Sequence, residues 1–468
     1  MHSVIPANTI AQSDSNSNKK ENDMIPIELQ LGKGLTLRLC QTEKFKTEML
    51  SLSAVLPICE EKPYMTSLLL SVLLRGTESY PEISSINRRL DYLFGTELSV
   101  RNFYRGDAHV FGLCANILGE EYLPEDIPER QTLLCDVVKI MREVFFSPAL
   151  DENGLLRAHY VESEKQLQRD AIRAKKNHPQ SYAMDSCRKL MFDNEPCGIP
   201  LYGTEEEVMA VTPEELTAYW KTLYQNLSLH AFYVGATDTE SVISALLGGL
   251  GIEKTTAETI QKNKPSIPLT DVTSIPCRRE EQRVCEDLPV HQSALVIGLR
   301  TPAAVQDADF FAVALYNELL GSSSPVSKLF LNVREKLGLC YSCFSTYNAY
   351  KAALIVCCSL EDDRREEAEA EIRRQIASLA AGDISDTEWK AAQESMANAY
   401  RQLSDSPSAM EVYYLGRALA GVSISPEEGS AHIASLARED VIRVAKQMKI
   451  DTVFVLHPTG EGEEQDDE

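Results

Sequence analysis

The chain of 468 residues has no apolar run of 18 residues, the length that a membrane-spanning helix needs. Its most apolar stretch, residues 67–74, is short and ends at Arg75. Basic residues are also scarce: 46 Lys and Arg stand against 70 Asp and Glu, which gives a net charge of −24. This balance argues against nucleic-acid binding, which depends on a basic surface, and it permits attraction of basic peptides.

Cysteine is too sparse for a disulfide scaffold, with 12 residues in the whole chain. Several, such as Cys40, Cys114 and Cys357, lie in apolar strand-like runs, where a free thiol behaves as a small hydrophobe. A reducing, cytoplasmic location is therefore expected. Residues 1–24 lack the apolar core of a secretion signal and are predicted to form a disordered leader. The acidic end, residues 459–468, is predicted to be a solvated tail.

Histidine pairs are missing as well. A helix that holds zinc presents two His ligands on one face, which requires a spacing of four residues. The eight histidines of this chain lie at least 19 residues apart. No helix of this sequence can therefore supply two His ligands to one metal ion.

The two halves of the sequence follow the same plan, which indicates an internal duplication. Each half is expected to have a strand, a helix, a Gly-containing loop, a second helix, a Gly and a two-strand unit. In the first half these are strands at 25–39 and 49–58, helices at 63–74 and 83–92, strands at 97–104 and 109–117, and a helical region at 131–192. In the second half they are a strand at 293–299, helices at 306–320 and 326–336, strands at 340–347 and 352–359, and a helix at 364–380.

The halves are separated by a segment rich in Thr, Ser, Pro and Lys, residues 254–277, which is typical of an interdomain linker. The fold class predicted is α+β, with two layered domains in which a largely antiparallel sheet packs against helices. The predicted limits are 25–253 for the first domain, 254–284 for the linker and 285–458 for the second domain.

One motif resembles the signature of a known family but lacks the metal ligands of that signature. Residues 67–77, SLLLSVLLRGT, predict an apolar helix that ends in an Arg-Gly-Thr turn. This resembles the signature helix of the M16 zinc proteases (pitrilysin-, insulinase- and mitochondrial-processing-peptidase-like), where His-x-x-Glu-His precedes a similar turn. In that alignment the two His ligands fall on Ser67 and Ser71, and the general-base Glu falls on Leu70. The third ligand, a Glu on a later helix, falls on Ala171.

A second motif matches the signature of the same family almost completely. The segments 321–330, GSSSPVSKLF, and 333–342, VREKLGLCYS, resemble the signature of the second M16 domain, with Cys340 in place of Ala. The resemblance covers residues 25–458 and implies two homologous domains of the M16 and LuxS metallohydrolase type. It also implies that Arg334 and Tyr341 contact a substrate backbone and stabilise a tetrahedral intermediate, a role that suits hydrogen-bond donors. The residues Gly321, Ser322, Ser323 and Ser324 would form the substrate loop.

In short M16 proteins the zinc motif and the Arg/Tyr pair are often carried by separate chains. The resemblance therefore implies a non-catalytic M16B-type subunit without cofactor, which binds peptide or unfolded protein and completes the site of a zinc-bearing M16 partner, as a heterodimer. Among such subunits the chain most resembles the bacterial one linked to aminopentanol modification of elongation factor P. The alternative is a non-proteolytic binding or scaffold protein, either a homodimer or the partner of a modification pathway.

Other candidate sites have less support in the sequence. Cys340 and Cys343 have no second pair for a zinc site, and on one strand they would point to opposite faces. Ser67 and Ser71 lack the Gly-x-Ser-x-Gly elbow of a nucleophile. The loop at 321–324 lacks the Gly-Lys-Ser/Thr ending of a phosphate-binding loop.

Overall fold

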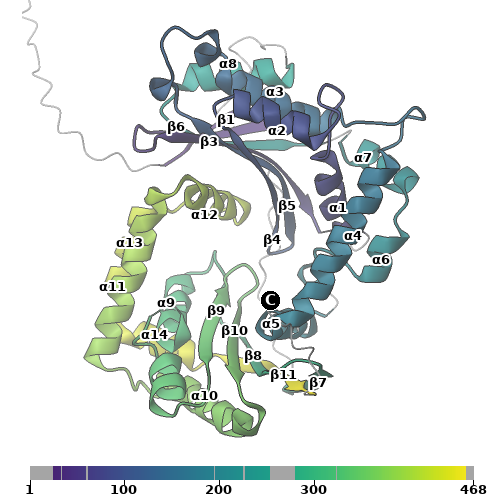
Figure 1. Ribbon diagram of the computed structural model, residues 1–468. Helices are drawn as coiled ribbons and strands as arrows, with labels where there is room; N and C mark the ends of the chain where they lie inside the picture. The colour runs from purple at the N-terminus through teal and green to yellow at the C-terminus, as the bar shows by residue number, and fades with distance from the viewer. Residues whose placement is uncertain are drawn as a thin grey trace, which may run out of the picture.

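The computed structural model describes residues 25–459, except for 33, 59–61, 194, 225–226, 253–279 and 323. The predicted leader, most of the predicted linker and almost all of the tail lie outside the described residues. Within the described ranges no helix is long and apolar enough to cross a bilayer. The chain forms two halves, each a sheet with helices, and long helices of each half extend toward the other (Figure 1).

The first half contains a six-stranded sheet in the order β1-β2-β6-β3-β5-β4. The strands are β1 Ile27–Gln30, β2 Leu35–Gln41, β3 Thr47–Pro57, β4 Glu97–Arg105, β5 Ala108–Leu118 and β6 Leu229–Gly235. The helices are α1 Pro63–Leu73, α2 Ile83–Tyr92, α3 Leu133–Phe146, α4 Ala158–Ala174, α5 Pro179–Met191, α6 Glu205–Ala210, α7 Pro213–Tyr224 and α8 Thr239–Leu250. Side chains alternate along β3, so Leu50 and Leu52 face the helices α1, α3, α7 and α8 in one apolar core.

The second half contains a five-stranded sheet in the order β7-β11-β8-β10-β9. The strands are β7 Gln282–Leu288, β8 Ser293–Arg300, β9 Ser342–Asn348, β10 Ala353–Leu360 and β11 Lys449–Pro458. The helices are α9 Phe310–Gly321, α10 Arg365–Ala380, α11 Asp386–Gln402, α12 Pro407–Leu419, α13 Pro426–Ser435 and α14 Arg438–Ala445, with a π-helix at Phe330–Lys336. The helices α9, α10 and α14 pack on one face of this sheet.

Apart from the additional edge strand β1, the two sheets have the same topology, which accounts for the repeated sequence plan. In each, a late strand (β6 or β11) lies between an early strand that it pairs in parallel (β2 or β7) and one that it pairs antiparallel (β3 or β8). A hairpin, β4–β5 or β9–β10, completes the other edge. By chain order α9 corresponds to α1, α11 to α4 and α12 to α5. The predicted α+β architecture with two sheet-and-helix halves is confirmed.

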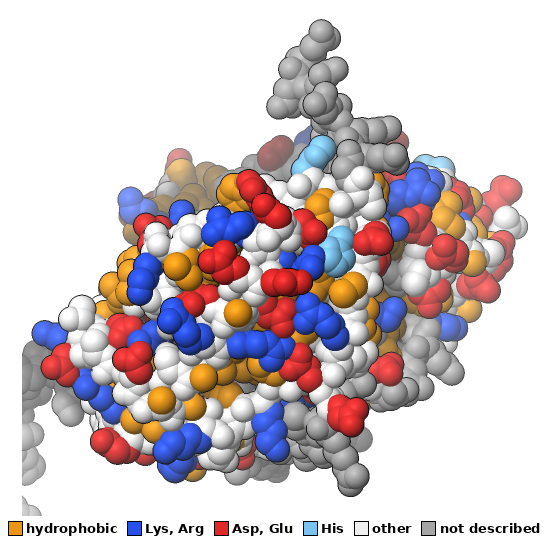
Figure 2. Space-filling model, turned by 90° about the horizontal axis from the view of Figure 1, so that it is seen from below, with side chains coloured by type: hydrophobic (Ala, Val, Ile, Leu, Met, Phe, Trp, Pro, Cys, Tyr) orange, Lys and Arg blue, Asp and Glu red, His pale blue; other side chains and the backbone are white. Residues whose placement is uncertain are grey.

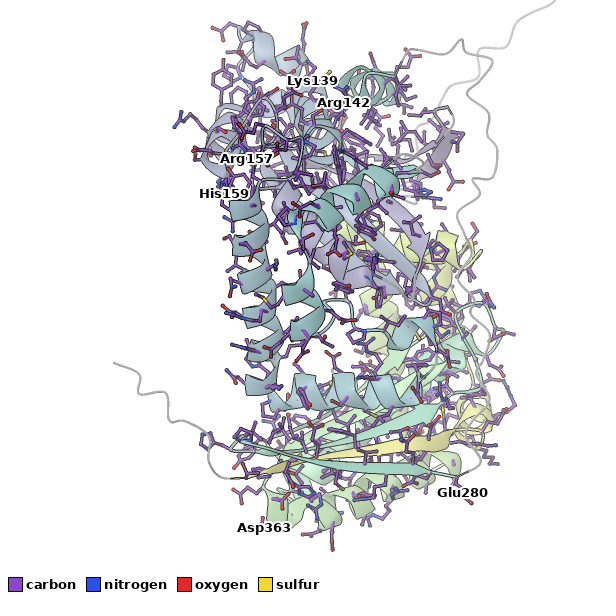
Figure 3. The ribbon with its side chains drawn as sticks, turned by 90° about the vertical axis from the view of Figure 1, so that its right-hand side faces the viewer. Lys139, Arg142, Arg157, His159, Glu280 and Asp363 are labelled. Carbon is purple, nitrogen blue, oxygen red and sulfur yellow. The ribbon has the colours of Figure 1, made fainter. Side chains whose placement is uncertain are left out.

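One helix of each half packs on the sheet of the other half. The helix α5 packs on the second sheet through Cys187, Met191 and Phe192, and it lies across that sheet in Figure 3, below α4, whose start is marked by Arg157 and His159. Gly298 of β8 permits this approach, because a side chain there would collide with the Met191 sulfur. Reciprocally, α12 covers the inner face of the first sheet through residues that include Met410 and Leu419.

Several predicted elements differ from the observed ones. The helix expected at 326–336 is a π-helix over Phe330–Lys336. The strand β7 begins at Gln282, inside the segment expected to be a linker. The central strands β6 and β11 were not predicted, because both lie far along the chain from the strands that they pair. The domain limits themselves remain a prediction.

On the lower face of the second half, acidic and basic side chains are interspersed (Figure 2). In the same half, α10 forms ion pairs of both kinds of residue: Arg283 binds Glu369 at 3.0 Å and Arg374 binds Glu371 at 2.7 Å. The net charge of −24 is therefore not gathered into one acidic patch on this face.

Candidate functional site

The helix α1 carries the three positions that align with the zinc motif. Pro63 begins this helix, and its run of Leu residues packs into the first core, with Leu70 only 2% exposed. Ser67 is buried, and its hydroxyl donates to the carbonyl of Leu201 at 2.9 Å. Ser71 is half-buried, and its hydroxyl lies 3.4 Å from the carbonyl of Ser67.

Ser67 also belongs to a side-chain network that extends into the β4–β5 hairpin. The amide nitrogen of Asn102 donates to Ser67 Oγ at 2.8 Å, and Asn102 Oδ1 lies 2.7 Å from His109 Nε2. Because Asn102 Oδ1 can only accept, the imidazole must donate through Nε2. Burial lowers the pKa of His109 to about 4, so the ring is neutral at pH 7. The Asn102 amide lies between Ser67 and His109, so this imidazole does not act as a general base on the Ser67 hydroxyl.

The helix α4 lies beside α1 and should carry the third ligand. Its face toward α1 presents Glu164, which pairs with Arg75, and Gln168, whose amide donates to the carbonyls of Tyr64 at 3.3 Å and Tyr202 at 3.0 Å. Ala171 lies on the next turn and is exposed. Sequence reasoning did not find Asn102, His109 or Gln168, since their proximity to Ser67 depends on how the hairpin and α4 pack.

These residues do not fit a zinc ion. Zinc in proteins takes Cys, His, Asp or Glu ligands, whereas Ser67 and Ser71 are engaged in hydrogen bonds, Leu70 is a core residue and Ala171 has no donor atom. Within the described ranges no group of three His, Cys, Asp or Glu residues is placed to hold a metal. Hydrolysis assisted by zinc therefore has no residues to support it at α1.

The second motif forms a turn between the π-helix and β9. The amide of Gly338 donates to the carbonyl of Arg334 at 3.1 Å, and Gly338 has φ +57°, a conformation that favours glycine. Local π-helical structure is frequent at functional sites. After the turn, the amide of Tyr341 donates to the carbonyl of Ser359 on β10 at 2.9 Å. The backbone on both sides of the Arg334–Tyr341 segment is thus fixed.

Arg334 and Tyr341 both reach solvent. The guanidinium of Arg334 lies 4.9 Å from the centre of the Phe330 ring and 3.7 Å from Glu335, with 45% of the side chain exposed. Tyr341 is 55% exposed, and its hydroxyl donates to Glu361 Oε1 at 3.0 Å. This hydrogen bond raises the pKa of Tyr341, so the phenol keeps its proton at neutral pH. The two side chains offer hydrogen-bond donors at the surface.

The serine loop follows the end of α9. Gly321 is the last residue of this helix, and a side chain at this position would collide with Leu329. Ser322 is half-buried and donates its amide to the carbonyl of Asn317, whereas Ser324 is buried and its hydroxyl accepts from the amide of Val326. Ser323 lies outside the described residues.

The cysteines near Tyr341 do not lie as expected. The strand β9 begins at Ser342, so Cys340 precedes it, and the prediction that Cys340 and Cys343 point to opposite faces of one strand is wrong. Cys343 lies opposite Cys358 in the register of the β9–β10 hairpin, and both thiols are free. Hydrogen bonds with both of these thiols, together with the charge of Arg334, lower the pKa of Cys340.

A protein-family model described as "Peptidase M16 inactive domain" matches residues 210–396. The "Probable inactive metalloprotease YmfF" of Bacillus subtilis is 29% identical over 91% of this chain and 96% of its own length. The chain is therefore similar to M16 peptidases, by the family model over residues 210–396 and by the YmfF relative over most of its length. The matches to an inactive-domain model and to a probable inactive metalloprotease support a non-catalytic pseudo-peptidase, in agreement with the motif alignment that places Ser67, Leu70 and Ser71 at the zinc positions. An "Uncharacterized zinc protease YmxG" of the same species is 25% identical over 63% of this chain and 68% of its own length.

Solved structures agree on the fold. A conserved protein from Enterococcus faecalis matches with a TM-score of 0.81 at 23% identity, over 94% of this chain and all of that one. A structure described as a peptidase M16 inactive domain from Pseudomonas fluorescens matches with a TM-score of 0.73 at 15% identity, over 94% of this chain and 99% of that one. The M16-like two-domain fold expected from the motifs is confirmed.

Proposed function

We propose that this M16 pseudo-peptidase binds peptide and completes the active site of a separate, zinc-bearing M16 chain. The observation that carries the proposal is the contrast between two sites of one molecule. The α1 positions that align with the zinc motif are filled by packed or hydrogen-bonded side chains, while Arg334 and Tyr341 lie on a fixed turn with exposed side chains. The zinc and the general base would then belong to the partner.

Arg334 and Tyr341 would act on the partner's substrate as donors. A tetrahedral intermediate develops negative charge on oxygen, which a guanidinium and a neutral phenol stabilise. Glu361 holds the Tyr341 hydroxyl in the free chain, so this bond must be exchanged for one to substrate. The pair would be positioned to help chemistry that the chain cannot perform alone.

Peptide binding has a natural place on the first sheet. The strand β4 is at the edge of that sheet and contains no proline, so one side of its backbone is unpaired by any described strand. Extended peptides add to such edges through main-chain hydrogen bonds. Because Asn102 of β4 contacts Ser67, a peptide on this edge would pass close to the degenerate zinc position.

The test uses the full chain co-expressed with a zinc-bearing M16 chain from the same genome. We expect a stable complex that cleaves unfolded peptides, and a decrease in kcat of about 10²-fold or more for Arg334→Ala and for Tyr341→Phe, the scale found when one oxyanion donor is removed. Tyr92→Phe is a matched control, because Tyr92 is also exposed and also donates to a carboxylate, that of Glu129 at 2.6 Å. Arg374→Ala controls for loss of an exposed Arg.

Two results would contradict the proposal. If both variants leave cleavage by the complex unchanged, a non-proteolytic binding or scaffold role becomes the better account. If the purified chain alone binds stoichiometric zinc and cleaves peptide, the division of labour is wrong. Metal analysis and a peptide assay on the isolated chain decide the second point.

A further inference from the structure

A cavity of about 550 Å³ lies mainly in the second half; its lining includes Ser322 of the serine loop but neither Arg334 nor Tyr341. It is framed by α9, α11, α12 and the turn between β9 and β10. Its walls are largely apolar and include five aromatic residues, Phe310, Tyr347, Tyr350, Tyr400 and Tyr413. Pockets of this size with apolar walls and a few polar groups are typical binding sites for small ligands.

The duplication relates this cavity to the degenerate zinc position. By chain order α9 and α11 correspond to α1 and α4, the helices that carry Ser67, Ser71 and Ala171. The β9–β10 turn corresponds to the β4–β5 turn. The second half therefore has a cavity where the first half has the remains of a metal site.

Two arginines line the cavity, and neither is paired with a carboxylate of the described part of the chain. Arg417 is only 5% exposed; its guanidinium lies 4.7 Å from the centre of the Phe310 ring and 5.1 Å from that of Tyr413. Its Nη2 is 3.4 Å from the Tyr400 hydroxyl, and its Nη1 is buried with no hydrogen-bond partner among the described residues. A buried guanidinium with an unsatisfied donor is costly unless an anion can pair with it.

Arg105 adds a second charge from the first half. Its guanidinium lies 4.8 Å from the Phe103 ring and 5.9 Å from the Tyr350 ring, and its hydrogen bond to the Tyr104 carbonyl is long, at 3.5 Å. Burial lowers the pKa of Arg105. Among the described residues no Asp or Glu oxygen forms an ion pair with Arg105 or Arg417. The acidic residue of the cavity wall, Glu318, is hydrogen-bonded to Ser395 at 2.9 Å.

We propose that this cavity binds a carboxylate attached to an aromatic group, with the carboxylate at Arg417 and Arg105 and the ring among the tyrosines. Two sources offer this chemistry: the C-terminal residue of a peptide that ends in an aromatic side chain, and a free aromatic acid. A guanidinium recognises a carboxylate by charge and by paired hydrogen bonds. The site needs neither a partner chain nor Arg334 and Tyr341, so it stands or falls independently of the proposed function.

The experiment measures binding to the full chain by calorimetry or ligand-observed NMR. The probes are N-acetyl-L-phenylalanine, its amide, and a pentapeptide ending in Phe with a free or amidated C-terminus. We expect each acid to bind at least ten-fold more tightly than its amide. Tighter binding of the peptide acid than of N-acetylphenylalanine supports a peptide C-terminus as the ligand, and the reverse order supports a small acid.

Variants separate the cavity from unspecific binding. Ala399→Phe adds a ring at an exposed cavity position and keeps both arginines, and Arg105→Gln removes one charge; each should weaken binding at least ten-fold. Arg417→Met should do the same, and if it does not fold, the other two variants decide. Lys390→Met, which removes a 78% exposed cation from the same helix as Ala399, should bind as wild type. Equal affinity for acid and amide, or unaltered binding by Ala399→Phe, would overturn the proposal.

Discussion

At the scale of single residues, Leu70, which the motif alignment places at the general-base position, is part of the core. Leu70 is 2% exposed and packs among the leucines of α1. Leu70→Glu should therefore not restore a metal site but lower the free energy of unfolding by about 3 kcal/mol or more, since it removes apolar packing and buries a carboxyl group. Urea unfolding measures the change. Ser71→Ala should cost less than about 1 kcal/mol, because the Ser71 hydrogen bond is long; equal effects of the two would contradict this account.

Two buried histidines should make stability depend on pH. Burial lowers the pKa of both His109 and His230 to about 4, while an unfolded histidine has a pKa of about 6.5. Between these values the unfolded chain binds protons that the folded chain does not. The free energy of unfolding is therefore highest above pH 6.5 and falls toward pH 4, by about 2 kcal/mol per histidine at pH 5.

Urea midpoints at pH 7.5 and 5.0 check this dependence. His109→Gln can still donate to Asn102 but cannot take up a proton, so its midpoint should fall less between the two pH values. His159→Gln is the matched control, since His159 is exposed. A wild-type slope in His109→Gln would show that His109 does not titrate as expected.

What the sequence could establish at this scale was that no helix carries two histidines four residues apart, and the reason is local. Two His ligands on one helix must be four residues apart, so their absence from α1 can be read without a fold. The Ser67–Asn102–His109 network could not be predicted, because it depends on the position of the β4–β5 hairpin beside α1. The cysteine prediction failed through a shift of two residues in the start of β9.

At the scale of elements, the two hairpin turns meet at a buried ion pair. Lys351, after β9, lies 2.8 Å from Asp107, between β4 and β5, and 3.2 Å from Glu195. Its side chain is only 3% exposed. Lys351→Met should lower the free energy of unfolding by about 3–5 kcal/mol, because two carboxylates lose their buried partner.

Thermal or urea unfolding measures the stability of Lys351→Met, and a second substitution tests the cause of the loss. Adding Asp107→Asn to Lys351→Met should recover part of the loss, since it removes one of the unpaired charges. Lys390→Met, at an exposed site, should change stability by less than about 0.5 kcal/mol. A loss from Lys351→Met no larger than this control would mean that the ion pair contributes nothing net.

Elements close in sequence were the most predictable. The hairpins and α1, α2, α9 and α10 follow from periodicity and from glycines at their ends. The central strands β6 and β11 follow from neither, because β6 joins β2, nearly 200 residues earlier, and β11 joins β7. The π-helix replaces the predicted α-helix where the chain must turn at Gly338 toward β9.

At the scale of the whole molecule, the two halves are joined by the reciprocal packing of α5 and α12. Each helix belongs by sequence to one half and covers the sheet of the other. A half without its borrowed helix would expose an apolar sheet face to water, at a cost proportional to the area exposed. The halves of this pseudo-peptidase should therefore unfold as one cooperative unit, in contrast to domains that merely touch.

Charged substitutions on the two helices test this coupling. Leu419→Asp places a carboxylate between α12 and the first sheet, and Met191→Asp does the same between α5 and the second sheet, at two fully buried positions. If the halves are coupled, amide hydrogen exchange in the cores of both sheets, in β3 and in β8, should accelerate in each variant to a similar extent, because the most protected amides exchange through global unfolding. Acceleration confined to the sheet beneath the altered helix would show instead that each half unfolds independently. The helices α5 and α12 would then cover the sheets without coupling the stability of the two halves.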